Sequence, residues 1–289
     1  MREGAASRTA VLVCQGRAAA HGRLAVGRFD DPVAITLLSE DERVPVRRVR
    51  DGTAPSGWAE RAAFETVRAS SEVVVPRAVA IDDALRERPT PQLVILGAGL
   101  DARAWRLPAL STVDVFEVDH PASQADKRAR VGGLTPAARS LRFVAVDLSR
   151  ERLDEALAAA GHRPELPTTW LWEGVIPYLR RAEVAATLRA VGALTTAGGR
   201  LIANYQSPSM RARVGRLVAR AIAGPRSALA GEPWRSLWRP AQISSLLRDH
   251  GFAVVGDDDL STIASRLGMP ATQARSLATG RVAVADAVR

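Results

Sequence analysis

Residues 92–119 read QLVILGAGLDARAWRLPALSTVDVFEVD, and this stretch decides the fold. Residues 93–96 form a continuous apolar run, which is typical of a β-strand buried on both faces. Gly97 and Gly99 follow directly and allow a sharp turn and the close approach of a ligand to the backbone. Residues 113–118 predict a second strand, which ends in acidic side chains. This order of strand, glycine turn, short helix and strand indicates a site for a nucleotide-type ligand.

Two cofactor classes fit that pattern, and an ordinary tight turn of an α/β sheet is the structural alternative. The run G-A-G-L-D-A matches the loose dinucleotide fingerprint, with an acidic residue about 20 positions further on. Asp101 favours a different ligand, because a carboxylate at the turn opposes a pyrophosphate. S-adenosylmethionine carries a sulfonium and an ammonium cation and no phosphate. Acid at the turn therefore suits S-adenosylmethionine better than NAD.

The same stretch also carries a family resemblance. The segments V-I-L-G-A-G-L-D-A-R-A-W-R-L and F-E-V-D-H-P resemble the S-adenosylmethionine-dependent methyltransferases related to leucine carboxyl methyltransferase, in particular their actinobacterial branch. The resemblance covers most of the chain and extends to E-G-V-I-P-Y-L and G-E-P-W-R-S-L-W further on. It implies S-adenosylmethionine as the cofactor and a class I methyltransferase fold.

Composition narrows the class of protein. The chain has 289 residues, enough for one large α/β domain. We expect no membrane span, no metal site and a cytoplasmic location, since Cys14 is the only cysteine and the histidines are scattered. The net charge of +9 raises the question of nucleic acid. The arginines are spread through every segment and aromatic residues are scarce, which argues against nucleic acid as a partner.

Alternating strand and helix patterns predict the architecture. We expect one domain over 1–289, in which residues 89–289 form a doubly wound, mostly parallel seven-stranded sheet with an insertion near 208–238. Residues 1–88 are expected to form a helical N-terminal cover over the active site. Pro76 is expected to open a new helix within this cover. The final strand, near 280–285, is expected to run antiparallel to its neighbours.

The cofactor-binding residues follow from strand ends and from the resemblance. Asp119 ends the second strand and is the candidate for the ribose hydroxyls, with Glu117 as a structural neighbour. The resemblance implies that Arg77 binds the methionine carboxylate of the cofactor, because a guanidinium forks onto a carboxylate. It implies that Glu173 faces the methionine amine or the sulfonium. The pair Asp147 and Leu148 would bind adenine, and Gly97 and Gly99 in the turn would bind the methionine end of the cofactor.

The methyl acceptor is less well defined. Reaction at a carboxylate or hydroxyl oxygen of a small molecule is the expected transfer, while the family acts on a protein C-terminal carboxylate. A carboxylate acceptor needs no general base, whereas a hydroxyl needs one. Candidates for that base are His120, Tyr178 and Tyr205. Further residues fall in the family's recurring N-terminal pattern near the acceptor: Arg17, Arg28 and Asp31.

Two other functions remain open at this stage. The glycine turn is compatible with an NAD(P)-dependent oxidoreductase, although no Tyr-x-x-x-Lys pair is present and Lys127 is the only lysine. A cofactor-binding protein without catalysis is the other alternative. The sequence does not define the oligomeric state.

Overall fold

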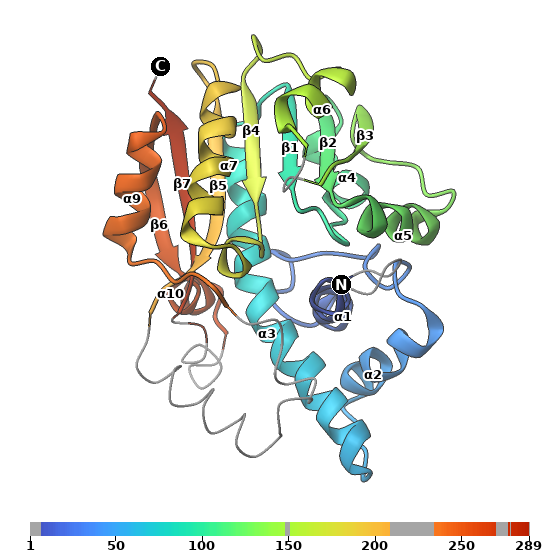
Figure 1. The fold of residues 1–289 in the computed structure, drawn as a ribbon. Helices are drawn as coiled ribbons and strands as arrows, with labels where there is room; N and C mark the ends of the chain where they lie inside the picture. Colours follow the sequence, from blue (N-terminus) through green and yellow to red (C-terminus); the bar gives the residue numbers. More distant parts are fainter. Residues whose placement is uncertain (1–6, 148–150, 209–233, 270–276, 278, 289) are drawn as a thin grey trace.

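The computed structural model describes residues 7–147, 151–208, 234–269, 277 and 279–288. Within them the strands form one seven-stranded sheet in the order β3-β2-β1-β4-β5-β7-β6 (Figure 1). Adjacent strands are parallel except that β7 is antiparallel to both β5 and β6. The predicted fold class and the predicted antiparallel last strand are confirmed. The strands are β1 Gln92–Leu96, β2 Asp114–Asp119, β3 Ser140–Ala145, β4 Thr168–Trp172, β5 Arg200–Gln206, β6 Phe252–Asp259 and β7 Gly280–Ala287.

Alternate residues of β1, at the centre of the sheet, enter two separate apolar cores. In β1, Leu93 and Ile95 pack into the core that includes the N-terminal helices. Val94 and Leu96 point to the opposite face and pack into the second core. This period of two buries the strand on both sides, as its unbroken apolar run predicts.

From residue 7 onward, three helices precede the sheet: α1 Arg8–Ala20, α2 Glu40–Asp51 and α3 Trp58–Glu87. Ser7 caps α1 by accepting a hydrogen bond from the backbone of Thr9, and Ser39 and Glu42 form a capping box at α2. Figure 1 shows α1 and α2 beyond the ends of the strands to which the arrows of β1, β2 and β4 point. The carboxyl ends of parallel strands are where α/β proteins bind ligands, so α1 lies at the ligand edge.

The prediction that Pro76 opens a new helix is wrong. Pro76 lies inside α3, a single helix of 30 residues that runs on both sides of it. A proline in a helix interior removes one backbone hydrogen bond and costs about 3 kcal/mol in isolation. Here the flanking residues Val75 and Ala78 are buried in the core, so tertiary packing keeps the helix continuous.

The remaining helices follow the strands closely. The glycine turn leads into α4, which has only four residues, so little helix separates the turn from β2. Residues 209–233, most of the predicted insertion, lie outside the described part of the chain. No helix within the described part is both long and apolar enough to cross a bilayer. The elements are α4 Arg103–Arg106, η1 Pro108–Leu110, α5 Pro121–Val131, α6 Leu153–Ala159, η2 Ile176–Tyr178, α7 Arg181–Ala193, α9 Pro240–Asp249 and α10 Leu260–Arg266.

Candidate functional site

A cavity of about 290 Å³ lies where the carboxyl ends of β1, β2 and β4 meet α1. We call it the turn pocket, since the whole glycine turn forms part of its wall. The sequence-predicted residues Arg77, Gly97, Gly99, Asp119 and Glu173 all line it. The remaining lining residues are Ser7, Thr9, Ala10, Val13, Arg17, Ile95, Ala98, Leu100, Asp101, Arg103, His120, Ser123, Gly174, Val175 and Tyr178.

The glycine turn requires its glycines. Gly97 has a φ of +68°, and a Cβ there would lie 2.5 Å from Cγ2 of Val175. Gly99 has a φ of +49°, and its Cβ would lie 3.3 Å from Cβ of Ala10 on α1. Both backbones therefore occupy the left-handed region that disfavours other residues. The turn brings peptide groups directly to the cavity wall.

Asp119 is fixed at the turn by two backbone hydrogen bonds. Its Oδ2 accepts from the N–H of Gly99 at 2.6 Å, and its Oδ1 accepts from the N–H of His120 at 2.7 Å. Each carboxylate oxygen has a further lone pair for a ligand hydroxyl. Glu117, two residues earlier, is fully buried and lies 2.6 Å from Nζ of Lys127. Glu117 is thus paired inside the protein, while Asp119 lies on the pocket wall.

Arg77 and Glu173 meet on the pocket wall. Nε of Arg77 donates to Oε1 of Glu173 at 2.6 Å, and Arg103 donates to Oε2 of the same carboxylate at 2.7 Å. Burial raises the pKa of Glu173, but the adjacent guanidinium groups outweigh it and hold that pKa below its usual range. Glu173 is therefore a buried carboxylate anion held between two cations.

Six further side chains extend this pair into a larger cluster. Arg103 also contacts Asp82 at 2.7 Å and Asp101, and Arg106 contacts Asp82 at 2.8 Å. Arg17 contacts Asp31 at 2.9 Å. We call the whole set the buried charge network. Its members are four arginines and four carboxylates: Arg17, Arg77, Arg103, Arg106, Asp31, Asp82, Asp101 and Glu173.

The sequence analysis missed the central residue of this network. Arg103 has a side chain only 3% exposed, and its surrounding carboxylates outweigh burial and raise its pKa well above the usual value. The signal was present in D-A-R-A-W-R, where two arginines alternate with the apolar residues that follow Asp101. Buried charges need partners, and those partners come from α3 and β4, which local patterns do not connect.

The three candidates for a general base separate in the structure. His120 and Tyr178 line the turn pocket. Tyr205 does not, and its assignment is corrected: it is fully buried in the second core, and its hydroxyl donates to Asp257 at 2.7 Å. Burial and the bond to Asp257 raise the pKa of Tyr205, which further opposes a role as base. Tyr205 belongs to the second core, and its hydrogen bond links β5 to β6 across the intervening β7.

The structure describes Asp147, one of the two residues predicted to bind adenine. Asp147 follows β3, is half-buried and donates its backbone N–H to Glu151 at 2.7 Å. It is not among the residues that line the turn pocket. Leu148 lies outside the described residues.

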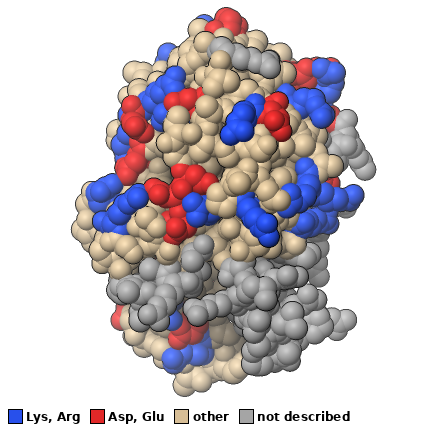
Figure 2. Space-filling model, turned by 90° about the vertical axis from the view of Figure 1, so that its left-hand side faces the viewer, with Lys and Arg blue, Asp and Glu red and all other residues tan. Residues whose placement is uncertain are grey.

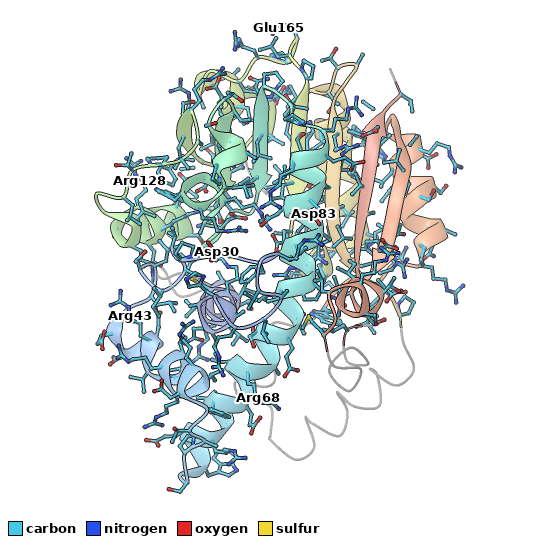
Figure 3. The ribbon with its side chains drawn as sticks, turned by 180° about the vertical axis from the view of Figure 1, so that it is seen from behind. Asp30, Arg43, Arg68, Asp83, Arg128 and Glu165 are labelled. Atoms are coloured by element: carbon cyan, nitrogen blue, oxygen red, sulfur yellow. The ribbon has the colours of Figure 1, made fainter. Side chains whose placement is uncertain are left out.

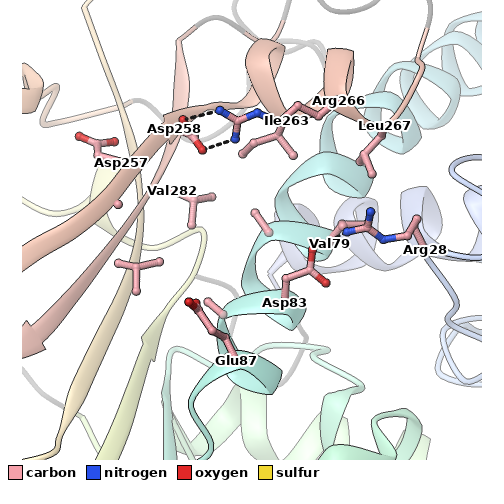
Figure 4. A pocket seen from close by; sticks show the side chains of 14 residues that line it. Arg28, Val79, Asp83, Glu87, Asp257, Asp258, Ile263, Arg266, Leu267 and Val282 are labelled. Atoms are coloured by element: carbon pink, nitrogen blue, oxygen red, sulfur yellow. Dashed lines mark hydrogen bonds and ion pairs between the residues drawn. The ribbon is translucent and has the colours of Figure 1, made fainter.

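A second cavity, of about 480 Å³, lies between α3, α10, β6 and β7 (Figure 4). Its apolar wall includes Val79, Ile263 and Val282. Arg28 belongs to this cavity and not to the turn pocket, and it lies 2.7 Å from Asp83. The family pattern groups Arg28 with Arg17, but the structure places Arg17 at the turn pocket and Arg28 at the second cavity.

The molecular surface shows mixed charge. Figure 2 shows arginine and acidic side chains interspersed over the described part of the face on the β6 side. No group of three or more histidine, cysteine or acidic side chains within the described ranges is arranged to hold a metal ion.

Comparison with known sequences identifies relatives of the chain. The family model described as leucine carboxyl methyltransferase matches residues 10–192. A protein of Frankia alni is 36% identical over 177 residues, which span 60% of this chain and 59% of that protein. A protein of Mycobacterium sp. (strain JLS) is 35% identical over 209 residues, which span 72% of this chain and 68% of that protein. Both are provisionally named S-adenosyl-L-methionine-dependent methyltransferases.

Solved structures with the same fold are more distant in sequence. A protein of Thermobifida fusca, provisionally named a methyltransferase, superposes with a TM-score of 0.57 at 13% identity, over 98% of this chain and 95% of that one. A DUF574 family protein of Streptomyces avermitilis has a TM-score of 0.55 at 14% identity, over 98% of each chain. These similarities support the fold alone.

Proposed function

The chain belongs to the leucine carboxyl methyltransferase family of S-adenosylmethionine-dependent enzymes, and we propose that it methylates an oxygen of a small-molecule acceptor. The turn pocket is the proposed cofactor site. The observation that carries this proposal is the contact between Arg77 and Glu173 on its wall. A guanidinium and a carboxylate side by side are complementary to the carboxylate and ammonium of an amino acid.

The pocket residues fit S-adenosylmethionine in other respects. Gly97 and Gly99 provide a backbone surface without side chains, and Asp119 offers free lone pairs beside it. We assign Asp119 to the ribose hydroxyls, Arg77 to the methionine carboxylate and Glu173 to the ammonium group. Asp147, with Leu148, is assigned to adenine.

Transfer to oxygen requires orientation and the exclusion of water more than acid–base chemistry. When bound, S-adenosylmethionine supplies a methyl group on a sulfonium, which an acceptor oxygen attacks in line. Residues of α1 cover the pocket, and exclusion of water strengthens every electrostatic contact inside it. A carboxylate acceptor attacks as an anion. A hydroxyl acceptor transfers its proton to His120 or Tyr178, which are the base candidates on the pocket wall.

The oxidoreductase alternative loses support from the position of Lys127. This residue, the only lysine, is 1% exposed and pairs with Glu117 at 2.6 Å. It is therefore not available as a catalytic lysine. A reducing cytoplasm remains the proposed compartment, because Cys14 is a buried thiol that donates to the carbonyl of Ala34.

Two measurements test the proposed function. Calorimetry with S-adenosylmethionine, NADH and NADPH should show saturable binding of the first alone. Transfer of labelled methyl from the cofactor is then measured with carboxylic acids, phenols and a peptide ending in a free carboxylate. Labelling of a small acid or phenol supports the proposal, and labelling of the peptide alone identifies a protein acceptor. Cofactor binding without any labelled product favours a binding protein without catalysis.

A further inference from the structure

Among the residues that the structure describes, the charges of the buried charge network balance. Four guanidinium groups oppose four carboxylates, and every side chain in the set is at most 15% exposed. Charges removed from water interact more strongly and are screened less by salt than surface charges. Loss of one charged member therefore leaves one unit charge uncompensated. This charge changes the electrostatic potential in the adjacent turn pocket.

Asp82 occupies a special place in this network. It does not line the turn pocket, yet its Oδ1 accepts from Arg103 at 2.7 Å and its Oδ2 lies 2.8 Å from Arg106. Arg103 does line the pocket and contacts Glu173 at 2.7 Å. Asp82 thus acts on the pocket through a second side chain and cannot touch the ligand itself.

The methyl donor and its demethylated product differ mainly in charge. S-adenosylmethionine carries a sulfonium cation, whereas S-adenosylhomocysteine has a neutral thioether at the same position. The ratio of their two affinities therefore reports the potential at the sulfur. A change that only loosens the fold weakens both ligands and cancels in this ratio.

We propose that Asp82 and Arg103 are specificity-determining residues that set the preference of the turn pocket for the cationic donor over the neutral product. This inference rests on the proposed function, because it requires the cofactor to bind in that pocket. The negative charge of Asp82 favours the donor, and the positive charge of Arg103 opposes it. Their balance sets how strongly the product competes with the donor after each turnover.

The test measures both dissociation constants by calorimetry for the full chain and its variants. Selectivity is the product constant divided by the donor constant. Asp82→Asn keeps the shape of the side chain and removes one negative charge, so selectivity should fall by about tenfold, which corresponds to about 1.4 kcal/mol. Arg103→Met should shift selectivity in the opposite direction, and Arg103→Lys should leave it near the wild-type value. A pH of about 8.5 keeps the carboxylates of the variants ionised.

Asp83 provides the matched control. It is the next residue on α3, pairs with Arg28 and has a side chain 45% exposed, so solvent screens its charge. Figure 3 labels Asp83 on the part of α3 that faces the viewer. Asp83→Asn should leave selectivity unchanged. Equal shifts in Asp82→Asn and Asp83→Asn would point to the overall charge of the protein and overturn the proposal.

The remaining outcomes are also decisive. Unchanged selectivity in Asp82→Asn, or the same direction of shift in Asp82→Asn and Arg103→Met, overturns the proposal while leaving the proposed function intact. If Asp82→Asn does not fold, Asp31→Asn carries the same expectation, since Asp31 is buried in the network and does not line the pocket. Failure of the wild type to bind either ligand instead refutes the proposed function.

Discussion

Oδ2 of Asp119 accepts a hydrogen bond of 2.6 Å from the backbone N–H of Gly99, 20 residues earlier in the chain. This bond joins the end of β2 to the turn after β1. The acid proposed to bind ribose and the turn proposed to bind the methionine end are therefore held at a fixed separation. A change at Asp119 should affect the ligand and the shape of the turn together.

Asp119→Ala should weaken S-adenosylmethionine binding by about one to two orders of magnitude. Hydrogen bonds to a charged group contribute roughly 1.5–3 kcal/mol, and each order of magnitude in affinity is about 1.4 kcal/mol. Calorimetry measures the loss, and Asp114→Ala, at the other end of β2, is the control. Wild-type affinity in Asp119→Ala would show that the ribose is bound elsewhere.

The buried pair of Glu117 and Lys127 should make stability depend on pH. Burial outweighs the attraction of Lys127 and raises the pKa of Glu117 from 4.5 to about 7. Between pH 4.5 and about pH 7, Glu117 therefore holds its proton in the folded protein and loses it in the unfolded chain. This stabilisation is complete below pH 4.5 and is lost as the pH rises through about 7.

Glu117→Gln removes this titration. The free energy of unfolding of the wild type, minus that of Glu117→Gln, should fall by a few kcal/mol as the pH rises from about 4.5 to about 7. Urea denaturation across this range measures both free energies. A difference that rises with pH would mean that the attraction of Lys127 outweighs burial.

The sheet could be predicted from the sequence because its signals are local. The apolar run of β1, the glycine turn and the acidic end of β2 occur within residues 92–119. The pocket residues at strand ends, such as Asp119 and Glu173, were found for the same reason. Parallel strands end at a common edge, so their terminal residues lie close together.

The buried charge network could not be predicted in this way. Arg77 and Glu173 are 96 residues apart, and Arg103 and Glu173 are 70 apart. Only the folded chain brings α3, the glycine turn and β4 to one point. Pro76 was misread for a related reason, because local propensity favours a helix start and the packing of α3 overrides it.

The two tyrosines near the carboxyl edge should differ in their roles. Tyr205→Phe removes one buried hydrogen bond to Asp257 and should lower the free energy of unfolding by about 1 kcal/mol, with methyl transfer unchanged. Tyr178→Phe alters the wall of the turn pocket. If Tyr178 is the base for a hydroxyl acceptor, its loss should slow transfer by about 10²-fold or more.

Chemical denaturation and single-turnover kinetics separate these effects. A carboxylate acceptor should react equally well with Tyr178→Phe, because it needs no base. Loss of transfer in Tyr205→Phe without loss of stability would contradict the assignment of Tyr205 to the core.

Helix α1 covers the turn pocket, so a larger side chain on its inner face should block the cofactor site. Ala10 lines the turn pocket, and its Cβ lies 3.3 Å from the position of a Cβ on Gly99. Ala10→Leu should fill part of the cavity of about 290 Å³ and weaken S-adenosylmethionine binding by at least about tenfold. Leucine is a good helix former, so the melting temperature should stay near the wild-type value. Val11→Leu, on the same helix but outside the pocket lining, is the control, and calorimetry with thermal melting measures both variants. Wild-type affinity in Ala10→Leu would show that α1 leaves the cofactor site when the ligand binds.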